Sequence, residues 1–362
     1  MCSPLRKKLP DFPWDALAPY GAKARTHPGG IIDLSQGTPV DPTPAFIQDV
    51  LATSANSPSY PTTAGTADLQ EAIRTWAISH LGITGDFDVL PVIGSKELVA
   101  WLPTLLEAQS VIFPKVAYPT YQVGARLSQA DEIAVDIDAN SWPVADLAWV
   151  NSPANPTGRV HSESELRTAI NWARRNNSVL ISDECYLEFG DSAIPTSIFN
   201  YTDGDNSKIL AVHSLSKRSS LAGYRAAFVL GDPSLIAAIR EIRKHAGMMV
   251  PLPVQKAMTA ALKDDDHVAQ ARARYNARRA TLKPALLAAG FRIEESAAGL
   301  YLWCTRDEDA WSSVDWLAQL GILATPGSFY GPDGARHIRI AMTATDAAIE
   351  DAAHRITEAV KG

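Results

Sequence analysis

The stretch His213-Ser-Leu-Ser-Lys-Arg-Ser-Ser-Leu-Ala-Gly-Tyr-Arg225 directly follows an apolar run, Ile209–Val212, that predicts a short buried strand. Lys217 lies just past the end of this predicted strand, among hydroxyl groups. A lysine amine that is desolvated or placed near other cations loses its proton and can form a Schiff base with an aldehyde. The neighbouring groups that could hold a phosphate are the side chains of Ser214, Ser216 and Arg225.

These features together give the hypothesis that Lys217 carries pyridoxal phosphate. A lone lysine is more often a solvated surface charge, so the hypothesis needs support from other segments. The first two-thirds of the chain alternates short apolar runs with helical patterns, the clearest of which begins at Ser162 with a capping box completed by Glu165. This alternation predicts an α/β domain with a mostly parallel sheet covered by helices on both faces. The predicted strands are 110–113, 133–135, 147–150, 179–181, 209–212 and 226–230.

Polar side chains follow three of these strands, at the edge of the sheet where ligands bind in such folds. Asn151-Ser-Pro-Ala-Asn-Pro-Thr-Gly158 follows the strand that ends at Val150, and Asp183-Glu-Cys-Tyr186 follows the next. With Ser214 to Lys217, three independent strand ends offer an amide, a carboxylate with a tyrosine, and a lysine. We therefore expect Asn155, Asp183, Tyr186 and Lys217 to lie close together.

Candidates outside these strand ends carry a weaker argument on their own. Ser95 and Lys96 open a predicted helix, whose unpaired amides and dipole favour a phosphate, although a plain serine N-cap is the commoner use. Gly37 could let a ligand approach the backbone or could form an ordinary turn. Tyr60 lies in a loop, where tyrosine is more often packed or exposed than functional. The following segment, 67–81, predicts an amphipathic helix with Leu69, Ile73, Trp76 and Ile78 facing inward.

A second, smaller unit is expected after the segment Gly247-Met-Met-Val-Pro-Leu-Pro253, which has the composition of a hinge. Helical patterns run to about Leu287 and include Arg272, Arg274, Arg278 and Arg279, which predict a solvated cationic face. The final strand pattern, His337–Ala341, alternates polar and apolar residues. Its Arg339 suits bidentate carboxylate binding, although a salt bridge on an edge strand is the default expectation.

Composition limits the class of protein. A chain of 362 residues predicts two domains, and the 46% hydrophobic and 20% charged content is that of an ordinary globular protein. The net charge of −7 argues against a nucleic-acid or anionic-membrane surface. The widely separated Cys2, Cys185 and Cys304 fit a reducing compartment and lack metal-ligand spacing, so we expect no metal site. Since no signal-peptide pattern or apolar run of about 18 residues is present, the chain is expected to be cytoplasmic.

Taken together, the segments from Gly37 to Arg339 resemble the class I and II aminotransferases of pyridoxal-phosphate fold type I. The resemblance implies an arm and part of the small domain at 1–40, a large cofactor-binding domain at 41–245, and a small α+β domain at 246–362. More narrowly, five segments resemble actinobacterial N-succinyldiaminopimelate aminotransferases of lysine and cell-wall biosynthesis. They are Gly94-Ser-Lys-Glu97, Ala117-Tyr-Pro-Thr-Tyr121, Ser182-Asp-Glu-Cys-Tyr186, His213-Ser-Leu-Ser-Lys217 and Arg243-Lys-His-Ala-Gly-Met-Met-Val-Pro251.

The resemblance implies a role for each matching residue. Lys217 would bond to the cofactor and then move the substrate proton, and Asp183 would pair with the pyridine nitrogen. Tyr186 and Asn155 would donate hydrogen bonds to the phenolic oxygen of the ring. An aromatic ring would stack on the cofactor; Tyr118 is the choice, with Tyr121 left open because Tyr118 stands farther from Pro114 than in many relatives. The phosphate would be held by the backbone of Ser95 and Lys96 at the start of their helix, and by Ser214, Ser216 and Arg225.

For the substrate, the resemblance assigns the α-carboxylate to Gly37 and Arg339. Tyr60 would be supplied by the other subunit of a homodimer. Lys96, Arg126 and Arg218 are guesses for the residues that bind the distal, succinylated end. The leading reaction is amino exchange between N-succinyl-LL-2,6-diaminopimelate and 2-oxoglutarate, with other aminotransferases (aspartate, kynurenine or LL-diaminopimelate) and a carbon-sulfur lyase as alternatives. A non-catalytic regulatory module would bring a DNA-binding domain, for which no room is expected before Gly37.

Overall fold

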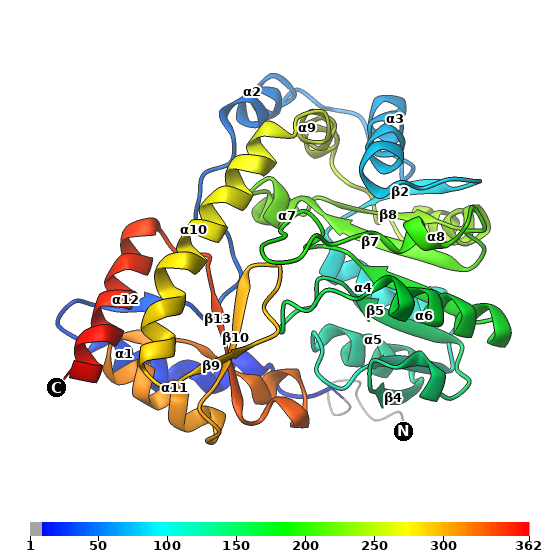
Figure 1. Cartoon of the computed structure of the whole chain (residues 1–362). Helices are drawn as coiled ribbons and strands as arrows, with labels where there is room; N and C mark the ends of the chain where they lie inside the picture. Colours follow the sequence, from blue (N-terminus) through cyan, green and yellow to red (C-terminus); the bar gives the residue numbers. More distant parts are fainter. Residues whose placement is uncertain (1–8, 362) are drawn as a thin grey trace, which may run out of the picture.

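A computed structural model describes residues 9–361, and within this range the strands form three sheets. The largest has seven strands in the order β2-β8-β7-β6-β5-β3-β4, and β8 runs antiparallel to both of its neighbours. The mostly parallel sheet expected from the sequence is confirmed (Figure 1). Its strands are β2 (Asp88–Val92), β3 (Ser110–Pro114), β4 (Asp131–Val135), β5 (Leu147–Asn151), β6 (Val179–Asp183), β7 (Ile209–Ser214) and β8 (Ala227–Gly231).

Helices cover both faces of this sheet because successive residues of each strand point to opposite faces. In β5, Ala148 and Val150 belong to a core with α3 (Ala67–Trp76), α6 (Glu163–Asn176) and α9 (Leu252–Leu262). Leu147 and Trp149 belong to the opposite core with α4 (Ser95–Leu105), α5 (Thr120–Ser128) and α8 (Pro233–His245). The capping box at Ser162 and Glu165 opens α6 as predicted.

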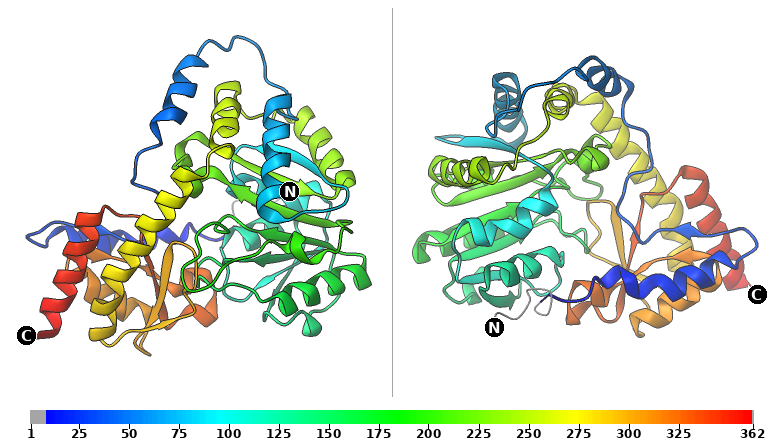
Figure 2. Two further views of the ribbon diagram at one scale, coloured as in Figure 1. Left: turned by 45° about the horizontal axis from the view of Figure 1, so that its top comes forward. Right: turned by 180° about the vertical axis from the view of Figure 1, so that it is seen from behind.

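The smaller unit is built on an antiparallel sheet in the order β12-β13-β10-β9. Its core also takes in a short parallel pair, β1 with β11, so that chain segments from both ends pack together. Figure 2 shows α1 lying with the C-terminal elements while the next segment crosses to α2 (Ala45–Thr53) on the larger unit. The elements are α1 (Ala18–Arg25), β1 (Ile32–Asp33), α10 (Asp266–Ala288), β9 (Arg292–Glu294), β10 (Tyr301–Thr305), α11 (Ala310–Gln319), β11 (Ile322–Leu323), β12 (Thr325–Pro326), β13 (His337–Ala341) and α12 (Asp346–Lys361).

Two expectations about side-chain burial are wrong. Ile78 is 58% exposed, because α3 gives way at Ala77 to a π-helical turn in which Ala77 and Leu81 take the inward positions. Arg278 and Arg279 do not form a solvated face, since both are 3% exposed. Arg278 lies between Asp41 and Asp346, and Arg279 donates to the backbone carbonyl oxygens of Ser296 and Gly299, so protein partners replace water around both guanidinium groups.

Some expectations concern parts of the chain outside the described residues. Cys2 and the first eight residues of the expected arm belong to this group. In the described part of the arm, Trp14 packs against Phe329 and Tyr330 of the same chain. None of the helices within 9–361 is long and apolar enough to cross a membrane.

Candidate active site

A cavity with a volume of about 1020 Å³ opens at the carboxyl ends of β5, β6 and β7, where it meets the smaller unit. All but one of the residues expected to hold the cofactor or the substrate α-carboxylate line this cavity. They are Gly37, Ser95, Lys96, Tyr118, Asn155, Asp183, Tyr186, Ser214, Ser216, Lys217, Arg225 and Arg339. The residues expected from separate parts of the sequence therefore meet at one cavity.

Lys217 lies on α7 (Leu215–Arg218), the four-residue helix that follows β7. Burial, followed by the nearby guanidinium of Arg339, lowers the pKa of Lys217 from 10.5 to about 8. At pH 7 about a tenth of this amine is therefore unprotonated, far more than of an ordinary lysine, and the unprotonated amine is the form that attacks carbonyl carbon.

Asp183 is the last residue of β6. It is buried and lines the same cavity as Lys217. Its carboxylate accepts hydrogen bonds from Tyr121 Oη at 2.8 Å and from the backbone N–H of Cys185 at 3.2 Å. Burial nevertheless raises the pKa of Asp183 above its ordinary value. Tyr121 stacks on Trp149 beneath this carboxylate, whereas Tyr118 lines the cavity itself. The two tyrosines thus occupy different positions, and only Tyr118 can meet a ligand's ring.

The residues expected to hold a phosphate include the start of α4 and Arg225. Gly94 precedes Ser95 with a φ of 98°, and a Cβ at this glycine would collide with the Arg225 guanidinium. The backbone therefore passes directly against that side chain, as only glycine allows. Burial and the charge of Arg225 lower the pKa of Lys96. On the opposite side, Ser214 Oγ accepts from the backbone N–H of Ser216 at 3.1 Å.

Arg339 approaches from the smaller unit. It is 3% exposed and lies on an inner strand, so the expected edge-strand salt bridge is wrong. Its guanidinium donates to Asn155 Oδ1 at 3.1 Å and to the Ser35 carbonyl oxygen at 2.6 Å, and it lies 4.1 Å from the centre of the Tyr301 ring. Asn155 is held in turn by Asn151 Oδ1, which accepts from its backbone N–H at 2.8 Å.

Tyr301 is a site residue that sequence reasoning missed. Its hydroxyl lies 2.9 Å from that of Tyr186, and a Cβ at Gly37 would clash with it. Burial raises the pKa of Tyr186, so this hydroxyl stays a proton donor at neutral pH. In sequence an aromatic residue within an apolar strand reads as core. The sequence signal that could have identified Tyr301 is Gly299, a glycine just before the strand β10.

Three expected residues lie elsewhere. Tyr60 is 94% exposed and does not line the cavity of its own chain. Arg126 is absent from the cavity wall and pairs with Glu132 at 2.7 Å. Arg218 is buried and pairs with Glu188 at 2.7 Å, facing away from the main cavity. Of the guesses for a distal contact, Lys96 alone reaches the wall.

Charges at the cavity test whether pyridoxal phosphate fits. Within residues 9–361, Asp183, Arg225 and Arg339 form no ion pair, although Asp183 and Arg339 are buried. The Nε of Arg339 also lacks a hydrogen-bond partner in this range. Buried charges normally have partners, so this wall lacks a cation beside Asp183 and an anion beside Arg339, and the exposed Arg225 offers a place for a second anion. A pyridinium nitrogen, a phosphate and a substrate carboxylate supply these charges, and the residues fit the cofactor. Over the same residues no cluster of His, Cys, Asp and Glu could hold a metal ion.

Comparison with known proteins agrees with this chemistry. A family model described as aminotransferase class I and II matches residues 30–356. The chain is 53% identical to a probable aminotransferase of Mycobacterium tuberculosis, over 96% of this chain and 85% of the relative. It is 50% identical to the 4-dedimethylamino-4-oxo-anhydrotetracycline transaminase OxyQ of Streptomyces rimosus, over 97% and 100%. A solved structure of a probable N-succinyldiaminopimelate aminotransferase from Thermus thermophilus superposes with a TM-score of 0.88 at 27% identity, covering 96% of this chain and 100% of the other.

Proposed function

Since the chain belongs to the class I and II aminotransferases, which depend on pyridoxal phosphate, we propose that it exchanges amino groups between N-succinyl-LL-2,6-diaminopimelate and 2-oxoglutarate. The observation that carries the aminotransferase chemistry is the pair of buried charges at Asp183 and Arg339, which form no ion pair within residues 9–361, together with the exposed Arg225 at the same cavity as Lys217. The choice of substrate rests on the five sequence segments that resemble N-succinyldiaminopimelate aminotransferases and on the position of Lys96.

Residues on the strand-end wall would hold the cofactor, which when bound supplies an aldehyde and an electron-withdrawing ring. Asp183 would accept from the ring nitrogen, and Tyr118 would lie against the ring face. Tyr186 and Asn155 would donate to the phenolic oxygen. The phosphate would be held by the backbone of Ser95 and Lys96 at the N-terminus of α4, and by Ser214, Ser216 and Arg225.

Lys217 would hold and move the proton. Its pKa of about 8 lets the amine accept a proton from the substrate α-carbon and return it at a neighbouring carbon within one cycle. Arg339 and Gly37 would bind the substrate α-carboxylate. Fixing that carboxylate would turn the α-hydrogen toward Lys217, so that the bond between the α-carbon and this hydrogen is the one that breaks.

Lys96 is the proposed partner of the distal succinyl carboxylate. Its ammonium lies 5.4 Å from the centre of the Phe12 ring, and both residues line the cavity. The lowered pKa of Lys96 reflects burial and a neighbouring cation, and a bound carboxylate would compensate both.

A second candidate is a transamination of a large polycyclic ketone, the class of compound that the name of the Streptomyces rimosus relative describes. Phe12, Trp14 and Phe329 line the cavity, and its volume of about 1020 Å³ exceeds the needs of a linear amino acid. Aromatic walls of this kind would stack on fused rings.

We also propose a homodimer in which Tyr60, exposed here, reaches the cavity of the other subunit. We keep the proposed domain boundaries, with a large domain at 41–245 and a small domain formed by 246–362 with part of 1–40. Helix α9, although it lies within 246–362, packs on the core of the larger unit. The cytoplasmic location, an absence of nucleic-acid partners and the diaminopimelate pathway likewise rest on the sequence.

Cofactor binding is tested by reconstituting the purified protein with pyridoxal phosphate. We expect a visible absorption band that borohydride removes, with a phosphopyridoxyl group left on Lys217 in the mass spectrum and none in Lys217→Ala. A reconstituted protein with no modified Lys217 would contradict the cofactor assignment.

Substrate choice needs half-reactions with glutamate, N-succinyl-LL-2,6-diaminopimelate, aspartate, kynurenine, LL-diaminopimelate and a polycyclic amine. Lys96→Met should raise KM for the succinylated substrate roughly 10-fold to 100-fold, the loss of one charge-assisted hydrogen bond, and leave KM for an aromatic substrate unchanged. Release of pyruvate and ammonia from a cysteine conjugate, without an amino acceptor, would instead indicate a carbon-sulfur lyase.

A further inference from the structure

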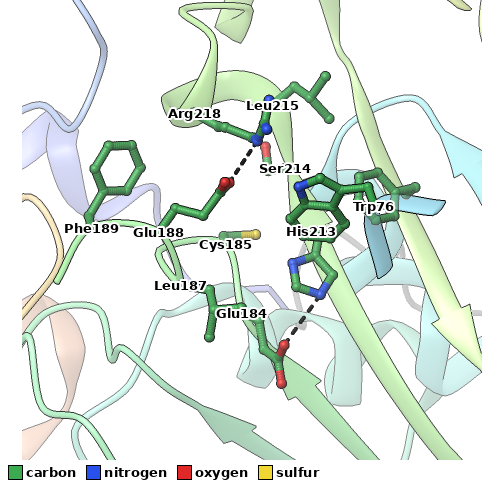
Figure 3. A pocket seen from close by; sticks show the side chains of 11 residues that line it. Trp76, Glu184, Cys185, Leu187, Glu188, Phe189, His213, Ser214, Leu215 and Arg218 are labelled. Atoms are coloured by element: carbon green, nitrogen blue, oxygen red, sulfur yellow. Dashed lines mark ion pairs between the residues drawn. The ribbon is translucent and has the colours of Figure 1, made fainter. Parts of the chain in front are cut away.

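A second, small cavity lies behind the strand ends that form the main site (Figure 3). Its volume of about 10 Å³ is room for roughly one water molecule. Cys185 and Ser214 line both cavities, so the small one lies a single side chain behind the large one.

Two ion pairs border this small cavity. Glu184 Oε2 lies 3.3 Å from His213 Nε2, and Glu188 Oε2 lies 2.7 Å from Arg218 Nε. Figure 3 shows both contacts, which we call the rear ion pairs. Each joins the segment 183–188 to the segment 213–218.

These same two segments carry the proposed catalytic groups on their other side. Asp183 and Tyr186 of the first segment, and Ser214 and Lys217 of the second, line the main cavity. Glu184 directly follows Asp183, His213 directly precedes Ser214, and Arg218 directly follows Lys217, yet these three neighbours line the small cavity and not the main one. The pairing of β6 with β7 places Asp183 opposite Val212 at this level. Each rear ion pair is thus attached by one peptide unit to a residue of the main site.

Helix α7 cannot hold Lys217 in place by itself. It is four residues long, and an isolated helix of that length has no stability of its own. Its last residue, Arg218, is 3% exposed and donates to the carbonyl oxygen of Ala261 at 2.6 Å in addition to its pairs with Glu188 and Asp265. The position of Lys217 therefore depends on the anchoring of the residue beside it.

The Glu184 pair is held just as firmly. Glu184 Oε1 accepts from Ser182 Oγ at 2.9 Å and from the backbone N–H of Ile198 at 2.8 Å. His213 is stacked on Phe228 and meets the edge of Trp76. Buried ion pairs are often no more stabilising than apolar residues of the same volume, and their clearest contribution is a defined geometry.

We propose that the residues of the rear ion pairs are positioning residues, which fix the separation between Asp183 and Lys217 and thereby set cofactor affinity and the rate of proton transfer. The inference rests on the proposed function. It assigns to Arg218 a task different from the distal substrate contact expected from the sequence.

Two variants remove one rear ion pair each. Glu188→Met keeps the side-chain length and loses the contact with Arg218. His213→Phe keeps a ring between Trp76 and Phe228 and loses the contact with Glu184. The matched control is Asp88→Leu at the far edge strand β2, since Asp88 is 19% exposed like Glu188 and pairs with Arg74 and Arg240.

The experiment measures the pyridoxal phosphate Kd of the apoprotein, kcat, KM and the urea midpoint for all four proteins. We expect Kd to rise about 10-fold and kcat to fall roughly 10-fold to 100-fold in both rear variants, as for small misplacements of reacting groups. KM should stay within about threefold, because Arg339 is carried by β13, outside both segments. Asp88→Leu should lose stability alone.

Rear variants whose Kd and kcat stay within about twofold of the native protein, like the control, would overturn the positioning role. Failure of both variants to fold would place the pairs in the structural core and overturn it as well. A native protein that binds no pyridoxal phosphate would contradict the proposed function itself, which is a separate result.

Discussion

Replacing Lys217 with methionine should stabilise the apoprotein, although it abolishes function. The native amine has a pKa of about 8 against 10.5 in an unfolded chain, so folding at neutral pH places a charged group where it is disfavoured. At about 1.4 kcal/mol per pH unit, the cost is about 3 kcal/mol, reduced by the partial contact of the amine with solvent. Methionine has a similar length and no charge, so it removes this cost.

The pH dependence gives this prediction its sign. Below pH 8 both folded and unfolded chains hold the proton, and the advantage of Lys217→Met is complete. Between pH 8 and 10.5 the unfolded chain binds a proton that the folded chain has released, so native stability rises with pH and the advantage disappears. Differences in packing add a constant that does not vary with pH.

Urea unfolding of both apoproteins at pH 7, 8, 9 and 10 measures the difference in the free energy of unfolding. A difference that is constant over this range, or that grows with pH, would refute the reasoning that burial depresses the Lys217 pKa.

Four further predictions follow from particular contacts. Gly94→Ala should displace Arg225 and raise the pyridoxal phosphate Kd roughly 10-fold to 100-fold, whereas Gly290→Ala, with a φ of 82° and open space, should leave Kd unchanged; equal effects would contradict the clash. Asp183→Asn should lower kcat roughly 10²-fold to 10³-fold while the cofactor still binds, and a loss below about tenfold in steady-state rates would argue against a charge-dependent role. Burial lowers the pKa of His161 to about 4, so the unfolded chain binds an extra proton between pH 6.5 and 4 and stability falls by about 3 kcal/mol on acidification; His161→Gln should flatten this part of the stability curve, and an unchanged curve would count against it. Mixing inactive Tyr60→Ala and Lys217→Ala proteins should restore activity through hybrid dimers with one intact site, and no recovery would show that Tyr60 does not act across an interface.

The sequence predicted the sheet and the part of the cavity wall at the strand ends because each depends on local patterns. Apolar runs mark the strands, and polar residues directly after them must gather at one edge of a parallel sheet. The different positions of Tyr118 and Tyr121 needed the structure, since both follow the same strand. Tyr121 donates a hydrogen bond to Asp183, whereas Tyr118 lines the cavity.

Other features depended on contacts between distant segments. The sequence predicted that Arg278 and Arg279 face solvent because their hydrogen-bond partners lie in distant segments of the chain. Tyr301 is assigned to the site only by its meeting with Gly37 and Tyr186. The residues that bind the far end of the substrate had no pattern at all, because a side chain on a helix or loop can serve there without any fixed spacing.

Because α7 is only four residues long, the lowered pKa of Lys217 depends on the rest of the protein and would not be kept in an isolated segment. A synthetic peptide of residues 209–225 would contain the lysine, both serines and the arginine, yet its amine would titrate as an ordinary lysine in water. That peptide contains neither the surroundings that bury Lys217 nor Arg339, which lies more than 100 residues further along the chain. Transplanting the motif into another scaffold would therefore require rebuilding its surroundings, with the backing of Glu188 and Ala261 included.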